Sequence, residues 1–162
     1  MAETLAVASL LAATITVGLM AGLYYAFTIS VMPGLARAGD QVFVAAMWQI
    51  NRAILNGWFA IGFGGSAVLA AIAAVLHLGD PSLPWIIAAL VLYVSTLVIT
   101  FGVNVPLNNA LDASGDPARS PDAAAVRAAF ETRWVRWNNA RTLVCVLALG
   151  CLAWALLVRG AP

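Results

Sequence analysis

The sequence contains very little charge. It has no lysine, and its eight arginines and seven acidic residues make up only 9% of the 162 residues, whereas charged residues form about 25% of an ordinary soluble domain. Hydrophobic residues account for 63% of the chain, so most of them must face something other than water. The composition therefore excludes a water-soluble globular domain and indicates an integral membrane protein. The net charge of +1 gives no electrostatic reason to expect nucleic-acid binding.

Residues that bind metals are equally scarce. The sequence has a single histidine, His77, and its two cysteines, Cys145 and Cys151, lie six residues apart in one apolar run. On a helix this spacing places the two thiols on different faces, so we do not expect a disulfide between them. These three residues cannot supply a histidine-rich or cysteine-rich metal site. We therefore predict neither a metal nor another bound cofactor.

Four segments are long enough, or nearly so, to cross a bilayer, which takes about 20 mainly apolar residues in a helix. Pro33 and Pro106 are expected to end the first and third spans, and GDPSLP (79–84) makes a turn between the second and third. We predict an all-α fold, a four-transmembrane-helix bundle that forms a single membrane domain over residues 1–162. The predicted spans are 5–32, 57–78, 85–103 and 142–158.

The segments before the second and fourth spans also have a helical pattern. Residues 40–55 begin with Asp40 in an N-cap position, and residues 120–141 begin with Ser120 as an N-cap and Pro121 in the first turn. Each is expected to continue into its span as one helix of about 38 residues, or about 57 Å. Such a helix exceeds the bilayer thickness, so helices 2 and 4 are predicted to extend on the cytoplasmic side.

The arginines lie unevenly around the spans. Seven of the eight fall between spans one and two or between spans three and four, and only Arg159 lies at the opposite end. Arginine-rich connections stay on the cytoplasmic side of a membrane. We therefore predict a multi-pass protein of a bacterial-type inner (plasma) membrane, with both termini outside.

Polar residues accompany the third and fourth spans at this arginine-rich end. Asn104 and Asn108 lie four apart after the third span, and Trp134, Asn138 and Arg141 share one helical face before the fourth. Polar side chains at membrane depth are unfavourable unless they pair or face a cavity, and they often mark functional sites. We therefore expect these residues to meet at a single depth.

The second span is preceded by Asn51 and Arg52, which belong to the same end of the protein. No acidic residue lies inside a predicted span, so Arg52 and Arg141 lack an obvious buried counter-ion. Three alternatives are open: they reach lipid phosphates, they pair with loop acids such as Asp112 or Glu131, or they hold an anionic or carbonyl ligand.

Two motifs, NVPLNNAL (104–111) and RWVRWNNAR (133–141), resemble the anthrone oxygenase-like family of small membrane proteins. The likeness extends to residues 21–35 and 47–56, and thus to nearly the whole chain. It implies four transmembrane helices. In some fungal and bacterial pathways it also implies oxidation of an anthrone to an anthraquinone by molecular oxygen, although many members of the family have no assigned activity.

The chemistry implied by this resemblance defines what a site must provide. Removing a proton from the CH₂ group of an anthrone gives an electron-rich enolate, which can react with O₂ without a metal. Asn104, Asn138 and Arg141 are the predicted catalytic residues, because preorganised donors stabilise developing negative charge. The predicted substrate-binding residues are Tyr24, Tyr25, Asn51, Arg52, Asn108, Trp134 and Trp137.

The base for this reaction is not evident. His77 lies at the outer end of the second span, across the bilayer from the polar residues, so a water molecule or a loop acid would have to take the proton. The expected partners are membrane lipids and a hydrophobic small molecule, and the chain is compatible with a homo-oligomer.

Two other classes of function stay open. A non-catalytic bundle that binds lipid or stabilises a partner complex would pair its polar residues with one another and leave no space beside them. A transporter component would need an oligomer and a polar path across the bilayer. The first, third and fourth spans offer only hydroxyl groups near their midpoints, which argues against transport.

Overall fold

The computed structural model describes residues 1–116 and 122–159 as a bundle of helices, with no strand in these ranges. Four helical stretches are long and apolar enough to cross a membrane, namely Ala2–Ala36, Gly57–Leu76, Leu83–Ala113 and Ala123–Arg159. This confirms the predicted all-α, four-transmembrane-helix architecture. The elements in chain order are α1 (Ala2–Ala26), η1 (Phe27–Val31), α2 (Met32–Ala36), α3 (Asp40–Ala53), α4 (Gly57–Leu76), α5 (Leu83–Ile99), η2 (Thr100–Asn104), α6 (Val105–Ala113) and α7 (Ala123–Arg159).

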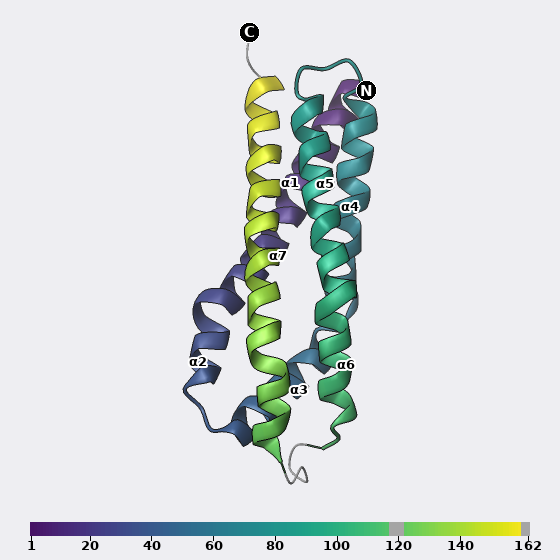
Figure 1. Cartoon of the computed structure of the whole chain (residues 1–162). Coiled ribbons are helices and arrows are strands. Elements are labelled where there is room, and N and C mark those ends of the chain that lie inside the picture. Colours follow the sequence, from purple (N-terminus) through teal and green to yellow (C-terminus); the bar gives the residue numbers. More distant parts are fainter. Residues whose placement is uncertain (117–121, 160–162) are drawn as a thin grey trace.

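The helices form one elongated bundle in which α1 packs against α4 and α7, and α5 packs against α7 and α4. Both ends of the chain and the turn between α4 and α5 lie at one end of the bundle, whereas α2, α3 and α6 lie at the other (Figure 1). The half of the bundle that holds the α4–α5 turn has a centre filled by fully buried residues such as Leu10, Val17, Tyr93 and Leu152. Apolar side chains at helical spacing thus hold the spans together, while the outward faces stay apolar as well.

The two prolines do not end their spans, contrary to the prediction. Both follow a wider, π-helical turn, η1 before Pro33 and η2 before Pro106. In η1 the Met32 N–H bonds to the Phe27 carbonyl, and in η2 the Val105 N–H bonds to the Thr100 carbonyl, five residues back in each case. A π-helical turn and a proline ring both interrupt the regular backbone pattern, and here each proline lies two residues after the end of a π-helical turn. The first span therefore runs to Ala36 and the third to Ala113.

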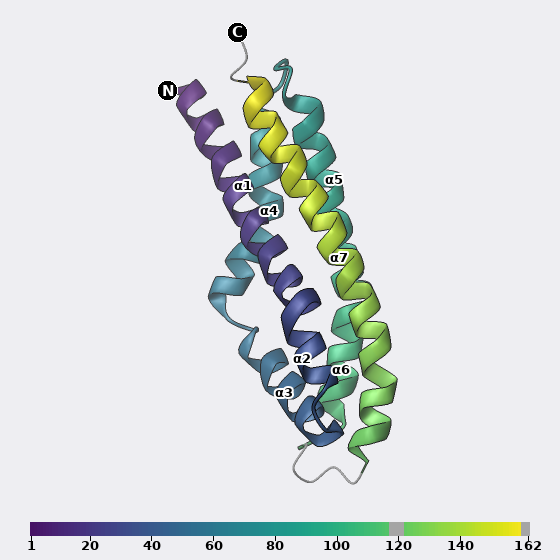
Figure 2. The same ribbon diagram turned by 90° about the vertical axis from the view of Figure 1, so that its left-hand side faces the viewer.

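The segment before the second span is a separate helix. The prediction that residues 40–55 continue into the second span as one helix is therefore wrong. Helix α3 ends at Ala53, and α4 begins at Gly57. Asn56 between them has an extended backbone (φ −131°, ψ 166°); its side chain accepts from the Phe59 N–H at 3.0 Å and donates to the Ala53 carbonyl at 2.8 Å. One side chain therefore satisfies an end of both helices, which stabilises the break. In Figure 2 the connection between α3 and α4 stands away from the other helices.

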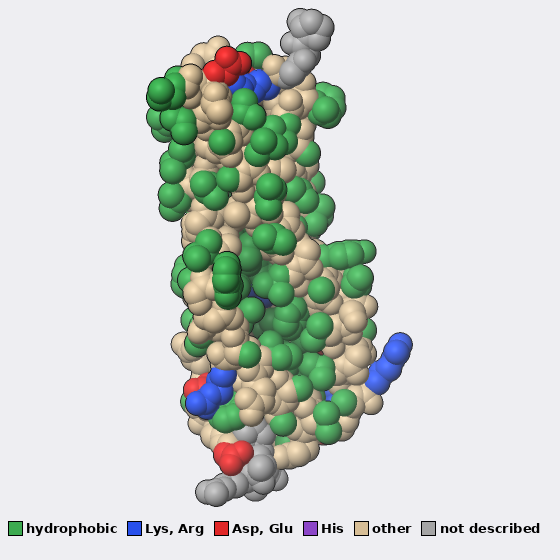
Figure 3. Space-filling view, turned by 180° about the vertical axis from the view of Figure 1, so that it is seen from behind, with side chains coloured by type: hydrophobic (Ala, Val, Ile, Leu, Met, Phe, Trp, Pro, Cys, Tyr) green, Lys and Arg blue, Asp and Glu red, His purple; other side chains and the backbone are tan. Residues whose placement is uncertain are grey.

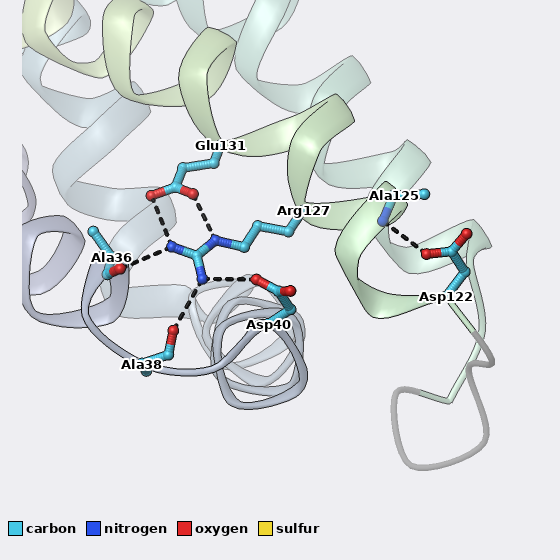
Figure 4. A network of polar contacts seen from close by, with 7 residues as sticks. All are labelled: Ala36, Ala38, Asp40, Asp122, Ala125, Arg127 and Glu131. Carbon is cyan, nitrogen blue, oxygen red and sulfur yellow. Dashed lines mark hydrogen bonds and ion pairs between the residues drawn. The ribbon is translucent and has the colours of Figure 1, made fainter.

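The fourth helix is continuous from Ala123 to Arg159. The predicted N-cap Ser120 and the neighbouring Pro121 lie outside the described residues. Instead, the Asp122 carboxylate accepts from the Ala125 N–H at 2.9 Å (Figure 4). For α3, the N-cap residue is Gly39, and the predicted cap Asp40 is the first helical residue.

Arg127 fastens the connection between α2 and α3 to α7 (Figure 4). Its guanidinium donates to the carbonyls of Ala36 and Ala38 at 3.0 and 2.9 Å, and to Asp40 at 2.9 Å. Glu131, one turn further along α7, accepts from the Nε of Arg127 at 2.6 Å. These charge-assisted contacts hold α3 across the end of the bundle.

Candidate functional site

A cavity of about 520 Å³ lies where the α3–α4 connection leaves the bundle, and we call it the main cavity. Helices α1, α3, α4, α6 and α7 and the turns η1 and η2 all contribute to its lining. The α3–α4 break itself supplies Ile54, Leu55, Asn56 and Gly57. The space-filling view from behind shows a hollow with hydrophobic side chains on its walls (Figure 3). The break that the sequence pattern did not predict therefore creates this space.

Aromatic rings form much of the wall. Phe59 and Phe63 stack with their centroids 5.1 Å apart, and Phe63 meets Phe101 edge to face at 5.6 Å. On the other side, Phe27 packs against Trp134 with centroids 5.5 Å apart. All five rings line the main cavity. Flat apolar walls of this kind suit a planar hydrophobic molecule.

The inner end of the main cavity is polar because Arg141 on α7 points into it. Arg141 is only 6% exposed and lines the cavity. One terminal nitrogen donates to the Thr100 hydroxyl at 3.3 Å, the other to the Asn138 side-chain oxygen at 2.9 Å. The guanidinium also lies 4.6 Å above the Tyr24 ring. All these partners are uncharged.

The charge of Arg141 is thus not balanced by a carboxylate in the part of the chain that the structure describes. The ion pairs found there join Arg52, Arg127 and Arg159 to acids, and Arg141 takes part in none of them. Its Nε is buried and makes no hydrogen bond to another described residue. A buried, unpaired cation is unfavourable, so this geometry favours an anionic or carbonyl group in the cavity.

Asn138 orients Arg141 and ties α7 to the end of α1. Its amide nitrogen donates to the Tyr24 carbonyl at 3.1 Å and to the Thr28 hydroxyl at 3.0 Å, while its oxygen accepts from Arg141. Both polar atoms of the Asn138 side chain are therefore used within the protein. The structure places Asn138 beside the guanidinium, as predicted, with its amide engaged in holding that group.

The asparagines of the third span separate into two environments. Asn108 lines the main cavity, and its side-chain oxygen accepts from the Trp134 indole N–H at 2.9 Å. Asn104 is 1% exposed, does not line the main cavity, and makes no side-chain hydrogen bond with the described residues. The predicted trio of donors is therefore incomplete, because Arg141 and Asn138 lie at the cavity but Asn104 lies behind its wall.

Asn51 and Arg52 on α3 also differ. Asn51 lines the main cavity, and its amide nitrogen is buried without a hydrogen-bond partner among the described residues. Arg52 lies over the Trp48 ring at 4.3 Å and pairs with Asp112 at 3.9 Å, outside the main cavity. For Arg52, the alternative of pairing with a loop acid is thus the one observed. Glu131 pairs with Arg127 and not with Arg141.

The remaining predicted binding residues lie in different places. Tyr24 lines the main cavity with a buried hydroxyl that has no hydrogen-bond partner among the described residues. Tyr25 is 51% exposed and Trp137 is half-buried, and neither lines the main cavity. Adjacent helical residues point in different directions, so Tyr24 and Tyr25 could not both face one site.

Several lining residues were missed by reasoning from the sequence. Thr100, Phe59, Phe63 and Phe101 line the main cavity, and Thr100 holds Arg141 directly. The spacing of four between Phe59 and Phe63 was a usable signal. Their meeting with Arg141 depends on how the helices are rotated, which spacing does not reveal. Within residues 1–116 and 122–159, no three histidine, cysteine or acidic side chains gather as metal ligands.

The comparisons with known proteins bear on the cavity-forming part of the chain. A family described as Anthrone oxygenase matches residues 55–151, which is more than half of the 162 residues. The match includes Thr100, Asn138 and Arg141, and so the polar end of the main cavity. No curated protein and no solved structure matches the chain. Its sequence match and its four apolar helices show that this chain belongs to the anthrone oxygenase family.

Proposed function

We propose that this protein is a cofactor-independent, membrane-bound oxygenase that converts an anthrone-like polycyclic phenol into a quinone. The observation that carries the proposal is the uncompensated Arg141 guanidinium at the inner end of an aromatic-walled cavity of about 520 Å³. A planar apolar substrate would occupy the cavity, with its ring oxygen against Arg141. The family match supports this assignment.

The proposed reaction uses the enolate of the substrate as the reductant of O₂. The CH₂ group loses a proton, and the electron pair spreads onto the ring oxygen as negative charge develops there. Arg141 donates to that oxygen, and Thr100 and Asn138 hold the guanidinium in place before the reaction. Attack on O₂ and loss of water then convert the CH₂ into a carbonyl, so that one anthrone and one O₂ give one anthraquinone and one water.

We further propose that the polar end of the bundle faces the cytoplasm of a bacterial-type inner membrane. Arg37 follows α2 and Arg52 lies in α3, and these two helices lie at the end of the bundle opposite the N-terminus and the α4–α5 turn (Figure 1). The main cavity would then sit near the inner headgroup layer. A hydrophobic substrate could reach it directly from the lipid.

A lipid-binding bundle is the second candidate, and one observation favours it. Leu55 and Phe101 line the main cavity and are 80% and 63% exposed, so the cavity opens beside apolar surface. An acyl chain would fit such walls. It would, however, leave the guanidinium of Arg141 without an anionic partner.

The deciding experiment supplies 1,8-dihydroxyanthrone to the detergent-purified protein and measures O₂ consumption above the spontaneous rate. We expect protein-dependent uptake of one O₂ per anthrone. With ¹⁸O₂, one labelled atom should enter the new carbonyl and the other should enter water. The absence of protein-dependent uptake, together with co-purified lipid in the cavity, would overturn the oxygenase proposal in favour of the lipid-binding one.

A further inference from the structure

A second cavity of about 370 Å³ adjoins the main cavity, and we call it the vestibule. The two cavities share five lining residues, Asn51, Ile54, Leu55, Val105 and Asn108. These shared side chains belong to α3, the α3–α4 connection and α6. The vestibule therefore adjoins the main cavity on the side of α3 and α6.

The vestibule is far more polar than the main cavity. Asn51, Arg52, Asn108, Asn109 and Asp112 supply five of its eight lining residues. At about 30 Å³ of liquid volume per water molecule, its volume is sufficient for several waters. The vestibule is thus a polar space, large enough for water, beside the apolar main cavity.

A line of polar residues runs from Asn104, the last residue of η2, along α6. Asn104, Asn108 and Asp112 lie four residues apart, and so on one face of the helix, with about 6 Å of rise between each pair. Exposure increases along the line: Asn104 is buried, Asn108 is half-buried and Asp112 is exposed. The line thus leads from a buried residue, through Asn108 in the wall shared by the two cavities, towards water.

Asp112 is the only carboxylate among the described residues that line either cavity. Its ion-pair partner among the described residues, Arg52, lies 3.9 Å away, and both side chains are 59% exposed. An exposed pair at this distance contributes little to stability. The Asp112 carboxylate therefore lies in an exposed, weak ion pair at the wall of the vestibule.

We propose that Asp112 is the proton acceptor for this reaction and that the vestibule conducts the proton to it; the inference rests on the proposed oxygenase function. The C–H bond of the substrate CH₂ breaks so that its electron pair stays on the substrate as the enolate, while the proton passes through vestibule water to the carboxylate. The enolate reduces O₂ as a C–O bond forms, and the resulting peroxide anion takes the proton back. The same carbon then loses its second proton, the O–O bond breaks and hydroxide leaves. This proton and the hydroxide combine as water.

The test separates proton removal from oxidation. The full-length protein is incubated with 1,8-dihydroxyanthrone in D₂O without oxygen, and deuterium uptake at the CH₂ is followed by mass spectrometry above the protein-free rate. Asp112→Asn is expected to lower both this exchange and aerobic O₂ uptake by about 10²-fold, the usual contribution of a general base. Asp112→Glu should retain most of the activity, and added formate should partly restore the activity of Asp112→Asn.

Two matched variants distinguish a proton acceptor from a structural role. Asp122→Asn makes the same chemical change at an acid outside both cavities, keeps a residue that can cap α7, and should not alter exchange. Arg52→Gln breaks the same ion pair but leaves the carboxylate. If Arg52→Gln reproduces the full loss and formate restores nothing, Asp112 acts only through its ion pair and the inference is wrong.

The outcome for the wild-type protein keeps the two proposals apart. Wild-type oxidation of the anthrone with an unchanged Asp112→Asn variant would overturn the role of Asp112 and leave the proposed oxygenase intact. A wild-type protein that catalyses neither exchange nor oxidation would overturn both.

Discussion

Replacing Arg141 with methionine is expected to remove activity while leaving the protein about as stable as before. Methionine keeps an unbranched chain as far as the position of Nε and removes the rest of the guanidinium, with all its charged donors. Removing one preorganised donor to a developing oxyanion typically lowers the rate by about 10²- to 10³-fold, or about 3 to 4 kcal/mol of transition-state stabilisation. We expect a loss of that size in the oxidation of 1,8-dihydroxyanthrone.

The effect on stability follows from opposing contributions at the same side chain. Arg141 makes two hydrogen bonds to uncharged partners, each worth about 1 kcal/mol, and lies over the Tyr24 ring, which adds about 1 to 2 kcal/mol. Against this, burying a charge without a counter-ion carries a penalty of several kcal/mol. Methionine removes both contributions, so the net change in the free energy of unfolding should be close to zero.

The assay compares O₂ uptake and melting temperature in detergent for Arg141→Met and Arg127→Met. Arg127 is a matched control because it lies on the same helix but donates to two carboxylates and two backbone carbonyls (Figure 4). Its substitution should lower the melting temperature, because it leaves Asp40 and Glu131 without their cation. A wild-type rate in Arg141→Met, or a loss of stability equal to that of Arg127→Met, would refute the role assigned to the unpaired guanidinium.

Two further predictions concern the cavity and the opposite end of the bundle. Ala60→Trp should fill the main cavity and raise KM or abolish substrate binding without altering Arg141. The control, Ala153→Trp on the exposed face of α7, should leave oxidation unchanged. Equal oxidation rates in the two variants would place the substrate elsewhere. At the turn between α4 and α5, the hydroxyl and N–H of Ser82 donate to Asp80 at 2.6 and 2.8 Å and hold the pKa of Asp80 below its ordinary value. The stabilisation by these two hydrogen bonds is fully present above about pH 4, the ordinary pKa of an aspartate, and is lost as the pH falls through the lowered pKa of Asp80. The melting temperature of wild type should therefore fall more steeply than that of Asp80→Asn on acidification below about pH 4, and parallel curves would contradict this assignment.

Several features of the site were accessible from the sequence because they depend on spacing along one helix. Trp134, Asn138 and Arg141 share a face of α7, and all three line the main cavity. The rings of Phe43 and Phe130 meet at 6.3 Å, and the asparagine eight residues after each of them, Asn51 or Asn138, lines the main cavity. The π-helical turns before Pro33 and Pro106, in contrast, were not predicted, although the two prolines and the two turns are each 73 residues apart.

Other features were not accessible because they depend on contacts between helices. Asn104 has the spacing of a site residue, yet it lies behind the cavity wall with both amide atoms unpaired among the described residues. Tyr25 lies next to Tyr24 in the chain and faces away from the site. The break at Asn56 did have a local signal, because Asn56 is a favoured N-cap residue and Asn-Gly is a turn dipeptide; the apolar helical pattern on both sides outweighed it in the prediction.

The sequence by itself determined that this protein crosses a membrane with four helices, because scarce charge and long apolar runs leave no other stable arrangement in water or lipid. It also determined that polar groups gather at one end, since that follows from their positions along the spans. Only the tertiary structure decided that a break between α3 and α4 opens a cavity and that the Arg141 guanidinium enters it without a carboxylate partner. Those outcomes depend on the rotation and packing of helices distant in the chain, and hydrophobic periodicity shows which face of a helix is buried but not what that face meets.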